Sequence, residues 1–197
     1  MARSRYHSAE QLLVDAEFAA HRAQGMSKPA PQIFNTSFLE EDRRQLTLAG
    51  ALGPAIRAGE ITAVYQPIID LKQRRVYGFE VLSRWTHPKL GFISPAEFVP
   101  MAEELGLVGE MDERVLRGAC EELRSWGAPG DTHLSANVSG RQADDLQLVD
   151  RVRETLNRTG FNPASLRLEV TETAVVKNPE RCRQVLDGLH VLAPHFL

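Results

Sequence analysis

Cysteine, histidine motifs and long apolar runs are scarce in this sequence, and each scarcity excludes a class of protein. The 197 residues include two cysteines, Cys120 and Cys182, neither in a CxxC motif, so we expect two buried reduced thiols. The six histidines form no HxxxH or HExxH pattern, which leaves a histidine-built zinc site without support. No apolar run approaches the roughly 18 residues that cross a bilayer. No secretory signal pattern is present either, so we expect a cytoplasmic protein.

The charge is nearly balanced. A formal net charge of −3, with 43% hydrophobic and 25% charged residues, is typical of a globular domain. A mildly acidic chain gains little from releasing the counterions of a nucleic-acid backbone. We therefore expect no nucleic acid as a partner, and the lack of a long apolar run leads us to expect no membrane partner either.

Composition and punctuation divide the chain into three regions, 1–30, 31–60 and 61–197. In the first, Ser8 and Gln11 form a capping box that predicts a helix, and the SKPAP stretch at 27–31 predicts a linker. The second is a helical candidate in which Gly50, Gly53 and Pro54 predict a kink or two short helices.

The third region alternates strands with helices. Strands are predicted at 63–69, 76–85, 133–139 and 166–171, and helices at 95–126 (broken near Gly106 and Gly109), 145–158 and 179–192. Strands alternating with helices of this length predict an α/β fold built on a mostly parallel sheet of about four strands, with the N-terminal helices added.

The second predicted strand carries an unusual polar face. Glu80, Leu82 and Arg84 lie at i, i+2 and i+4, so their side chains share one side of the strand. A carboxylate and a guanidinium on a covered face need an occupant between them, and a metal-bound phosphodiester would fit. The alternative is an edge strand whose polar face meets water.

Three more polar residues lie on or just after the later strands. Asn137 is central in the third strand and offers an amide oxygen to a hard cation, or else caps a backbone group. Glu169 is late in the fourth strand, and Glu172 follows where that strand should end. An isolated ExTE pattern has no specificity.

Taken together, the motifs are specific. The order and spacing of YQP at 65–67, EVLSRW at 80–85, SPAEFVP at 94–100, NVS at 137–139 and EVTE at 169–172 resemble the EAL domain of cyclic di-GMP phosphodiesterases. The resemblance covers about residues 61–189, with Val81 in place of the alanine of the signature. It implies a variant TIM barrel with its site at the carboxyl ends of the strands.

The resemblance also implies roles for individual residues. Glu80, Asn137 and Glu169 match metal ligands, and Gln66, Leu82 and Arg84 match positions that contact the dinucleotide; Glu172 matches a glutamate that steadies a loop of the active site. Such domains use Mg²⁺ or Mn²⁺ to activate the water that opens cyclic di-GMP to the linear dinucleotide.

A second, shorter resemblance lies at residues 6–25, which look like the last helix of a GGDEF domain. The Met-Tyr pair usual there is replaced by Ala20-His21. We interpret residues 1–30 as such a remnant with its linker, 31–60 as a linker helix region, and 61–197 as a truncated EAL domain.

The EAL pattern is incomplete in this sequence. The DDFGTG motif, whose aspartates are central metal ligands in the family, is absent, as are the later lysine, glutamate and glutamine. We therefore expect the first half of a barrel, with metal binding weak or absent, cyclic di-GMP binding weak, and no hydrolysis by the isolated chain.

Two alternatives to an inactive remnant remain open. One is a phosphodiesterase completed by a second-half polypeptide, and the other is a non-catalytic module that binds cyclic di-GMP or a protein. We also expect self-association, because an incomplete barrel would expose Leu82, Ala136 and Leu168 on its inner face.

Overall fold

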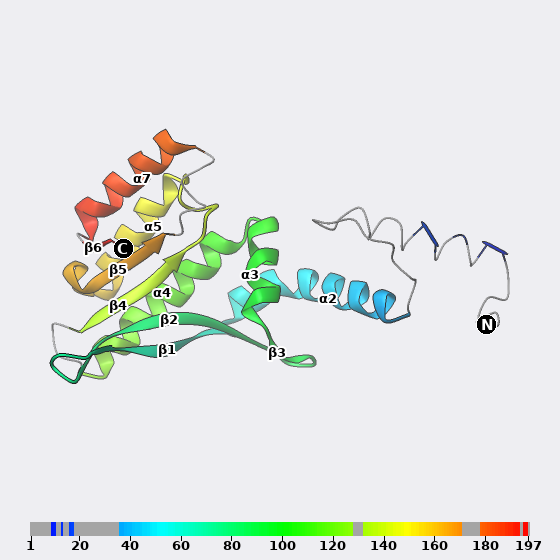
Figure 1. The fold of residues 1–197 in the computed structure, drawn as a ribbon, viewed down its shortest axis with the longest axis horizontal. Coiled ribbons are helices and arrows are strands. Elements are labelled where there is room, and N and C mark those ends of the chain that lie inside the picture. The colour runs from blue at the N-terminus through cyan, green and yellow to red at the C-terminus, as the bar shows by residue number, and fades with distance from the viewer. Residues whose placement is uncertain are drawn as a thin grey trace. The chain divides into compact units, whose positions relative to one another are not determined.

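The computed structural model describes residues 9–10, 13, 16–17, 36–127, 132–170, 178–193 and 195–196. It divides into two compact units, 1–48 and 49–197, and the second contains the sheet (Figure 1). Most of residues 6–25, the segment that resembles the last helix of a GGDEF domain, lies outside the described residues.

Of the two expectations for residues 31–60, the two short helices are wrong, and the kink stays a prediction. One continuous helix, α2 (Thr36–Ala58), contains Pro54 in its interior. Gly53 lies one residue before Pro54, and both remain helical. Leu52, Ala55 and Ile56 on this helix are buried. The packing of this apolar face stabilises the helix more than Gly53 and Pro54 destabilise it.

The described residues form a six-stranded sheet (Figure 1). The strands are β1 (Ile61–Asp70), β2 (Arg75–His87), β3 (Gly91–Ile93), β4 (His133–Val138), β5 (Leu166–Val170) and β6 (His195–Phe196). Their order is β1-β2-β4-β5-β6, with β3 paired to β2. Strands β2, β4, β5 and β6 are parallel, whereas β1 and β3 run antiparallel to β2.

The prediction of a mixed α/β fold is confirmed, but the predicted strand count is too low. β3 was missed because three residues after a turn give no periodicity, and β6 because it has two residues. The turn between β1 and β2 is too short for a crossover connection, which explains their antiparallel pairing. The partial barrel stays a prediction.

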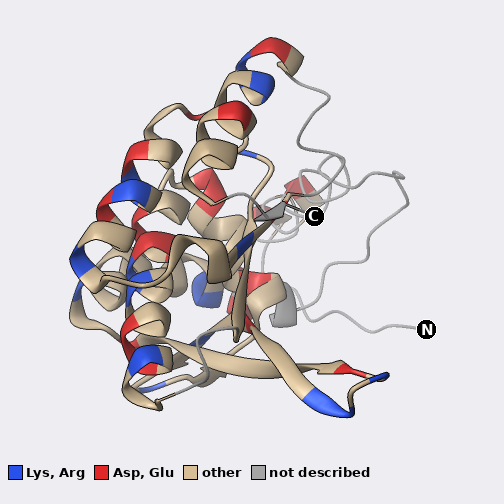
Figure 2. Ribbon diagram, turned by 90° about the vertical axis from the view of Figure 1, so that its left-hand side faces the viewer, with Lys and Arg blue, Asp and Glu red and all other residues tan. Residues whose placement is uncertain are grey.

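Helices α4 (Val108–Ser125), α5 (Gln147–Thr159) and α7 (Pro179–Leu192) lie side by side on one face of the sheet. The predicted break before α4 is confirmed: α3 (Pro95–Glu104) ends before Gly106, whose φ of +70° suits glycine. The helices carry interspersed charges of both signs (Figure 2). Both cysteines are buried and free, as expected.

The two faces of the sheet differ in polarity. Val81, Ala136 and Leu168 are paired in register across β2, β4 and β5, and all three are buried. Glu80, Leu82 and Asn137 alternate with them and so belong to the other face. The expectation that Ala136 and Leu168 share an exposed face with Leu82 is therefore wrong. Exposure of these two side chains is no longer a reason to expect self-association.

Strands β2 and β4 pair over a short stretch and then part. Their register runs from Gly78 opposite His133 to Val81 opposite Ala136. At the first pair the backbones approach so closely that a Cβ on Gly78 would lie 2.5 Å from the carbonyl oxygen of His133. Beyond Val81, β2 pairs with β1 and β3, while β4 pairs with β5. The parting opens a space at the carboxyl ends of these strands.

Candidate ligand-binding cleft

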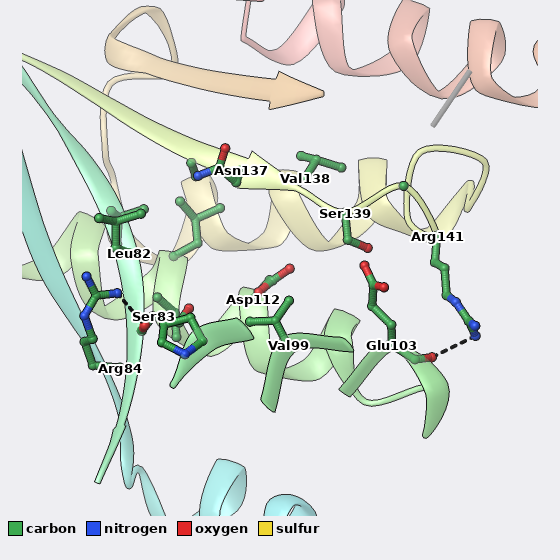
Figure 3. Close-up of a pocket in the computed structure, with 16 residues that line it drawn as sticks. Leu82, Ser83, Arg84, Val99, Glu103, Asp112, Asn137, Val138, Ser139 and Arg141 are labelled. Atoms are coloured by element: carbon green, nitrogen blue, oxygen red, sulfur yellow. Dashed lines mark hydrogen bonds between the residues drawn. The ribbon is translucent and has the colours of Figure 1, made fainter. Parts of the chain in front are cut away.

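A cleft of about 690 Å³ occupies the space where β2 and β4 part (Figure 3). Its walls come from β2, α3, α4 and the end of β4 with the turn that follows. The lining residues are Val81, Leu82, Ser83, Arg84, Pro95, Val99, Glu103, Asp112, Val115, Leu116 and residues 136–141. This position agrees with the general rule that α/β sheets bind ligands beyond the carboxyl ends of their strands.

Three of the residues predicted from the sequence line this cleft: Leu82, Arg84 and Asn137. Leu82 and Arg84 are half-buried on β2, and Asn137 is exposed at the end of β4. Arg84 Nη1 donates a hydrogen bond to the carbonyl oxygen of Ser83 at 2.9 Å. This bond to an adjacent backbone oxygen leaves other guanidinium donors available for a ligand.

Glu80 lies directly beside the cleft. Asn137 Nδ2 donates a hydrogen bond to Glu80 Oε1 at 2.8 Å. Gln66, exposed on β1, pairs in register with Glu80, and Glu169, half-buried on β5, pairs with Asn137. Register partners on neighbouring strands present their side chains to the same face. The structure thus places these four on one face of the sheet, and Glu172 lies outside the described residues.

The donor set on this face suits a hard divalent cation. Asn137 uses its amide nitrogen toward Glu80, which leaves its amide oxygen available beside two carboxylates. Within the described ranges, no three His, Cys, Asp or Glu side chains converge as a metal-binding group. The face therefore offers two carboxylates and one amide, which fit a cation but form a small ligand set.

Asp112 is the chemically distinctive residue that the sequence analysis missed. It projects from α4 into the cleft, as Glu103 does from α3, and Ser139 points toward them from the end of β4 (Figure 3). Burial raises the pKa of Asp112 to about 7; Glu103 adds to this rise, whereas Gln142 and Arg151 oppose it. A carboxyl group poised near neutral pH in a cleft is typical of a binding or catalytic position.

Sequence periodicity could not single out Asp112. Helix α4 carries other acidic residues whose side chains are ion-paired within the helix, such as Glu110 with Arg114 and Glu113 with Arg117. Asp112 differs because it follows the buried Met111 and faces the gap left by the parting strands. The signal lies in where β2 and β4 separate, which no local pattern records.

Comparison with known proteins identifies the class of domain. A mostly parallel sheet with helices on one face and a polar cleft at its carboxyl edge is typical of enzymes and ligand-binding domains of the α/β type. The model of the EAL domain family matches residues 49–192, so the chain belongs to the EAL domain family. EAL domains are generally dependent on a divalent metal.

Among curated relatives, the chain is 33% identical over 185 residues to the cyclic di-GMP phosphodiesterase NbdA of Pseudomonas aeruginosa, covering 93% of this chain and 24% of NbdA. It is 32% identical over 184 residues to MucR of the same organism, a bifunctional diguanylate cyclase and cyclic di-GMP phosphodiesterase, covering 92% of this chain and 27% of MucR. The chain thus spans about a quarter of the length of these relatives.

Solved structures give the same family. The phosphodiesterase domain of MucR in complex with c-di-GMP aligns with a TM-score of 0.69 and 34% identity, over 74% of this chain and 60% of that one. The FimX EAL domain of Xanthomonas citri, in complex with c-diGMP, aligns with a TM-score of 0.66 and 25% identity, over 78% and 60%. None of the helices in the described ranges has the length and apolar character needed to cross a membrane.

Proposed function

We propose that this EAL domain binds cyclic di-GMP in the cleft between β2 and β4. The observation that carries the proposal is the convergence of Leu82, Arg84, Asn137 and Asp112 from three different elements on one space at the carboxyl edge of the sheet. Support comes from MucR, a 34% identical structural relative whose complex with c-di-GMP is known.

Each lining residue has a function that its chemistry supports. The planar fork of Arg84 suits a phosphate oxygen. Asp112, when ionised, accepts two adjacent N–H groups and so matches the Watson–Crick edge of guanine, which presents N1–H and an exocyclic amine. Leu82 and the cleft residues Pro95 and Val99 give apolar walls for a flat base. Gln66, the register partner of Glu80 on β1, contacts the dinucleotide beside the cleft in this proposal.

Glu80, Asn137 and Glu169 are the residues that would hold Mg²⁺ or Mn²⁺ in this proposal. A cation bound there supplies Lewis-acid polarisation of a phosphodiester. The three side chains come from adjacent strands on one face, and Asn137 already orients Glu80. For Glu172, a role in steadying a loop rests on the family resemblance.

We infer that the isolated chain binds the dinucleotide without hydrolysing it. Two carboxylates and one amide are few ligands for a catalytic cation pair, and affinity for such cations depends on the number of charged ligands. The DDFGTG motif is absent from the sequence. A second candidate is a phosphodiesterase completed by another polypeptide that supplies those aspartates, and the oxygen donors aligned on β2, β4 and β5 favour it.

Titration calorimetry with cyclic di-GMP tests the binding proposal. We expect a saturable isotherm that Arg84→Ala weakens by about tenfold, the typical loss for one charge-assisted contact. Arg153→Ala, an exposed position on α5 that does not line the cleft, is the matched control. Equal binding of cyclic di-AMP, or an Arg84 variant that binds like the control variant, would contradict the proposal.

Chromatography of the reaction mixture tests the inference about hydrolysis. With Mg²⁺ or Mn²⁺ present, we expect no linear dinucleotide from the chain alone. Product that disappears in the Glu80→Ala variant would show that the chain hydrolyses its ligand unaided, since a contaminating enzyme would not respond to that substitution. Product formed only after addition of a polypeptide with the DDFGTG half would establish the second candidate.

A further inference from the structure

Gln142 is a buried polar residue in the turn after β4. The residue is 4% exposed. Its backbone N–H donates to the carbonyl oxygen of Ser139 at 2.9 Å, and its Oε1 accepts from the N–H of Ser139 at 3.4 Å. Gln142 therefore binds Ser139 through both backbone and side chain, which holds the end of β4 where Ser139 lines the cleft.

The amide nitrogen of Gln142 is left over from these contacts. It is buried and forms no hydrogen bond of regular geometry among the described residues. A buried N–H without an acceptor is costly, so a nearby acceptor is expected to recruit it. Gln142 and Asp112 line the same small cavity of about 40 Å³ behind the cleft. The amide already favours the charged form of the Asp112 carboxyl.

We propose that Gln142 is a positioning residue of the cleft: its amide nitrogen donates to the Asp112 carboxyl and fixes how that carboxyl faces the bound ligand. The part of this proposal that concerns the ligand rests on the proposed binding of cyclic di-GMP. Gln142 lines the cavity behind the cleft and not the cleft itself, so it acts through Asp112 and Ser139.

The charged groups around Asp112 leave this task to Gln142. Glu103, from α3, repels the ionised carboxyl. Arg151, from α5, attracts it, but Arg151 Nη2 already donates to Asp145 Oδ2 at 2.8 Å. On the β2 side, Arg84 is bonded to the carbonyl oxygen of Ser83. The Gln142 amide nitrogen is thus a donor with no other bond to lose; among the described residues the buried Ser139 hydroxyl, which also lines the cleft, is a second one.

Nuclear magnetic resonance on the ligand-free chain tests the contact directly. We expect the two side-chain N–H signals of Gln142 to shift with pH at the same midpoint as the side-chain carboxyl carbon of Asp112. In Gln142→Leu, which keeps the bulk and removes the amide, the Asp112 midpoint should move upward because a donor to its charged form is lost. Gln142 signals that ignore the ionisation of Asp112 would overturn the proposal, and this wild-type measurement holds even if the variant fails to fold.

Calorimetry then separates the two proposals. At pH 8, Gln142→Leu should bind cyclic di-GMP about tenfold more weakly, the typical loss for a charge-assisted hydrogen bond. Unchanged affinity in a folded Gln142→Leu variant would overturn the positioning of the ligand contact. Coupled Gln142 and Asp112 signals in a wild-type chain that binds no cyclic di-GMP would show that the contact exists and that the proposed function fails.

Discussion

Asn137 Nδ2, on β4, donates a 2.8 Å hydrogen bond to Glu80 Oε1, on β2, although the two residues are 57 positions apart in the chain. The bond leaves the amide oxygen of Asn137 on the same face as Glu169. A cation placed there would be held from β2, β4 and β5 together, so loss of one ligand should weaken the whole site.

Manganese titration followed by paramagnetic line broadening checks this expectation. We expect broadening of the backbone signals around Glu80 and Asn137, and we expect Glu80→Gln to require about tenfold more Mn²⁺ for the same effect, since one charged ligand is removed. Glu104→Gln, an exposed carboxylate on α3, serves as the control. Broadening that is equal in both variants would place the cation elsewhere.

Asp112 should make the stability of the domain depend on pH. Its folded pKa of about 7 exceeds the ordinary value of 3.8, so the folded chain holds one more proton than the unfolded chain between those values. The favourable contribution is complete below 3.8 and is lost as the pH rises through about 7. Stability should therefore fall from pH 5 to pH 8.

Denaturant unfolding of Asp112→Asn measures the size of this effect. A tenfold change in proton affinity is worth about 1.4 kcal/mol, and because Asp112 keeps partial exposure we expect a total of about 2 kcal/mol. Between pH 5 and pH 8, the free energy of unfolding of the variant should fall by about 2 kcal/mol less than that of the wild type. Asp144→Asn, a half-buried aspartate that lines neither cavity, should retain the wild-type profile.

Leu168 tests which face of the sheet is covered. It is 2% exposed beneath the helices, whereas Leu82 is half-buried on the opposite face. Leu168→Ala should lower the free energy of unfolding by about 2–5 kcal/mol, as is typical of buried leucines. Leu82→Ala should cost clearly less in the same thermal or chemical melt. The reverse order of the two variants would restore the expectation that Leu168 lies on the open face.

Gly78 is predicted to be intolerant of a side chain. A Cβ there meets backbone, 2.5 Å from the carbonyl oxygen of His133, so β2 and β4 would have to separate. We expect Gly78→Ala to destabilise by about 2 kcal/mol, in the range of overpacked sites. Gly118→Ala in α4 meets nothing within 4 Å and should stabilise by up to about 1 kcal/mol. Similar melting temperatures for the two variants would contradict the close approach.

The sequence predicted several helices and strands correctly because the pattern that indicates each of them lies within the element itself. The strand expected at 133–139 is β4 (His133–Val138), and the helix expected at 145–158 is α5 (Gln147–Thr159). Gly160 ends α5 in the left-handed conformation, with φ of 61°, as a glycine beyond the last apolar residue suggests. Apolar periodicity and a glycine at the C-terminal end of a helix can both be recognised in one short stretch of sequence.

What the sequence did not predict depends on relationships between elements. The pattern of β1 says nothing about its direction, and the inward and outward faces of β4 and β5 were assigned the wrong way for Ala136 and Leu168. Alternation shows that two sets of side chains point apart, but not which set meets the helices. Asp112 was overlooked for the same reason, since its surroundings are assembled from β2, α3, α4 and β4.

The short ladder between Gly78 and Val81 on β2 and its partners on β4 has a mechanical consequence. Past it, one wall of the cleft is tied to the β1–β2–β3 antiparallel ribbon and the other to β5. Within the described sheet, the two walls are therefore joined to each other only through this ladder. A ligand that touches both Arg84 and Asn137 would connect the two walls, and slower amide hydrogen exchange at the carboxyl ends of β2 and β4 would report its binding.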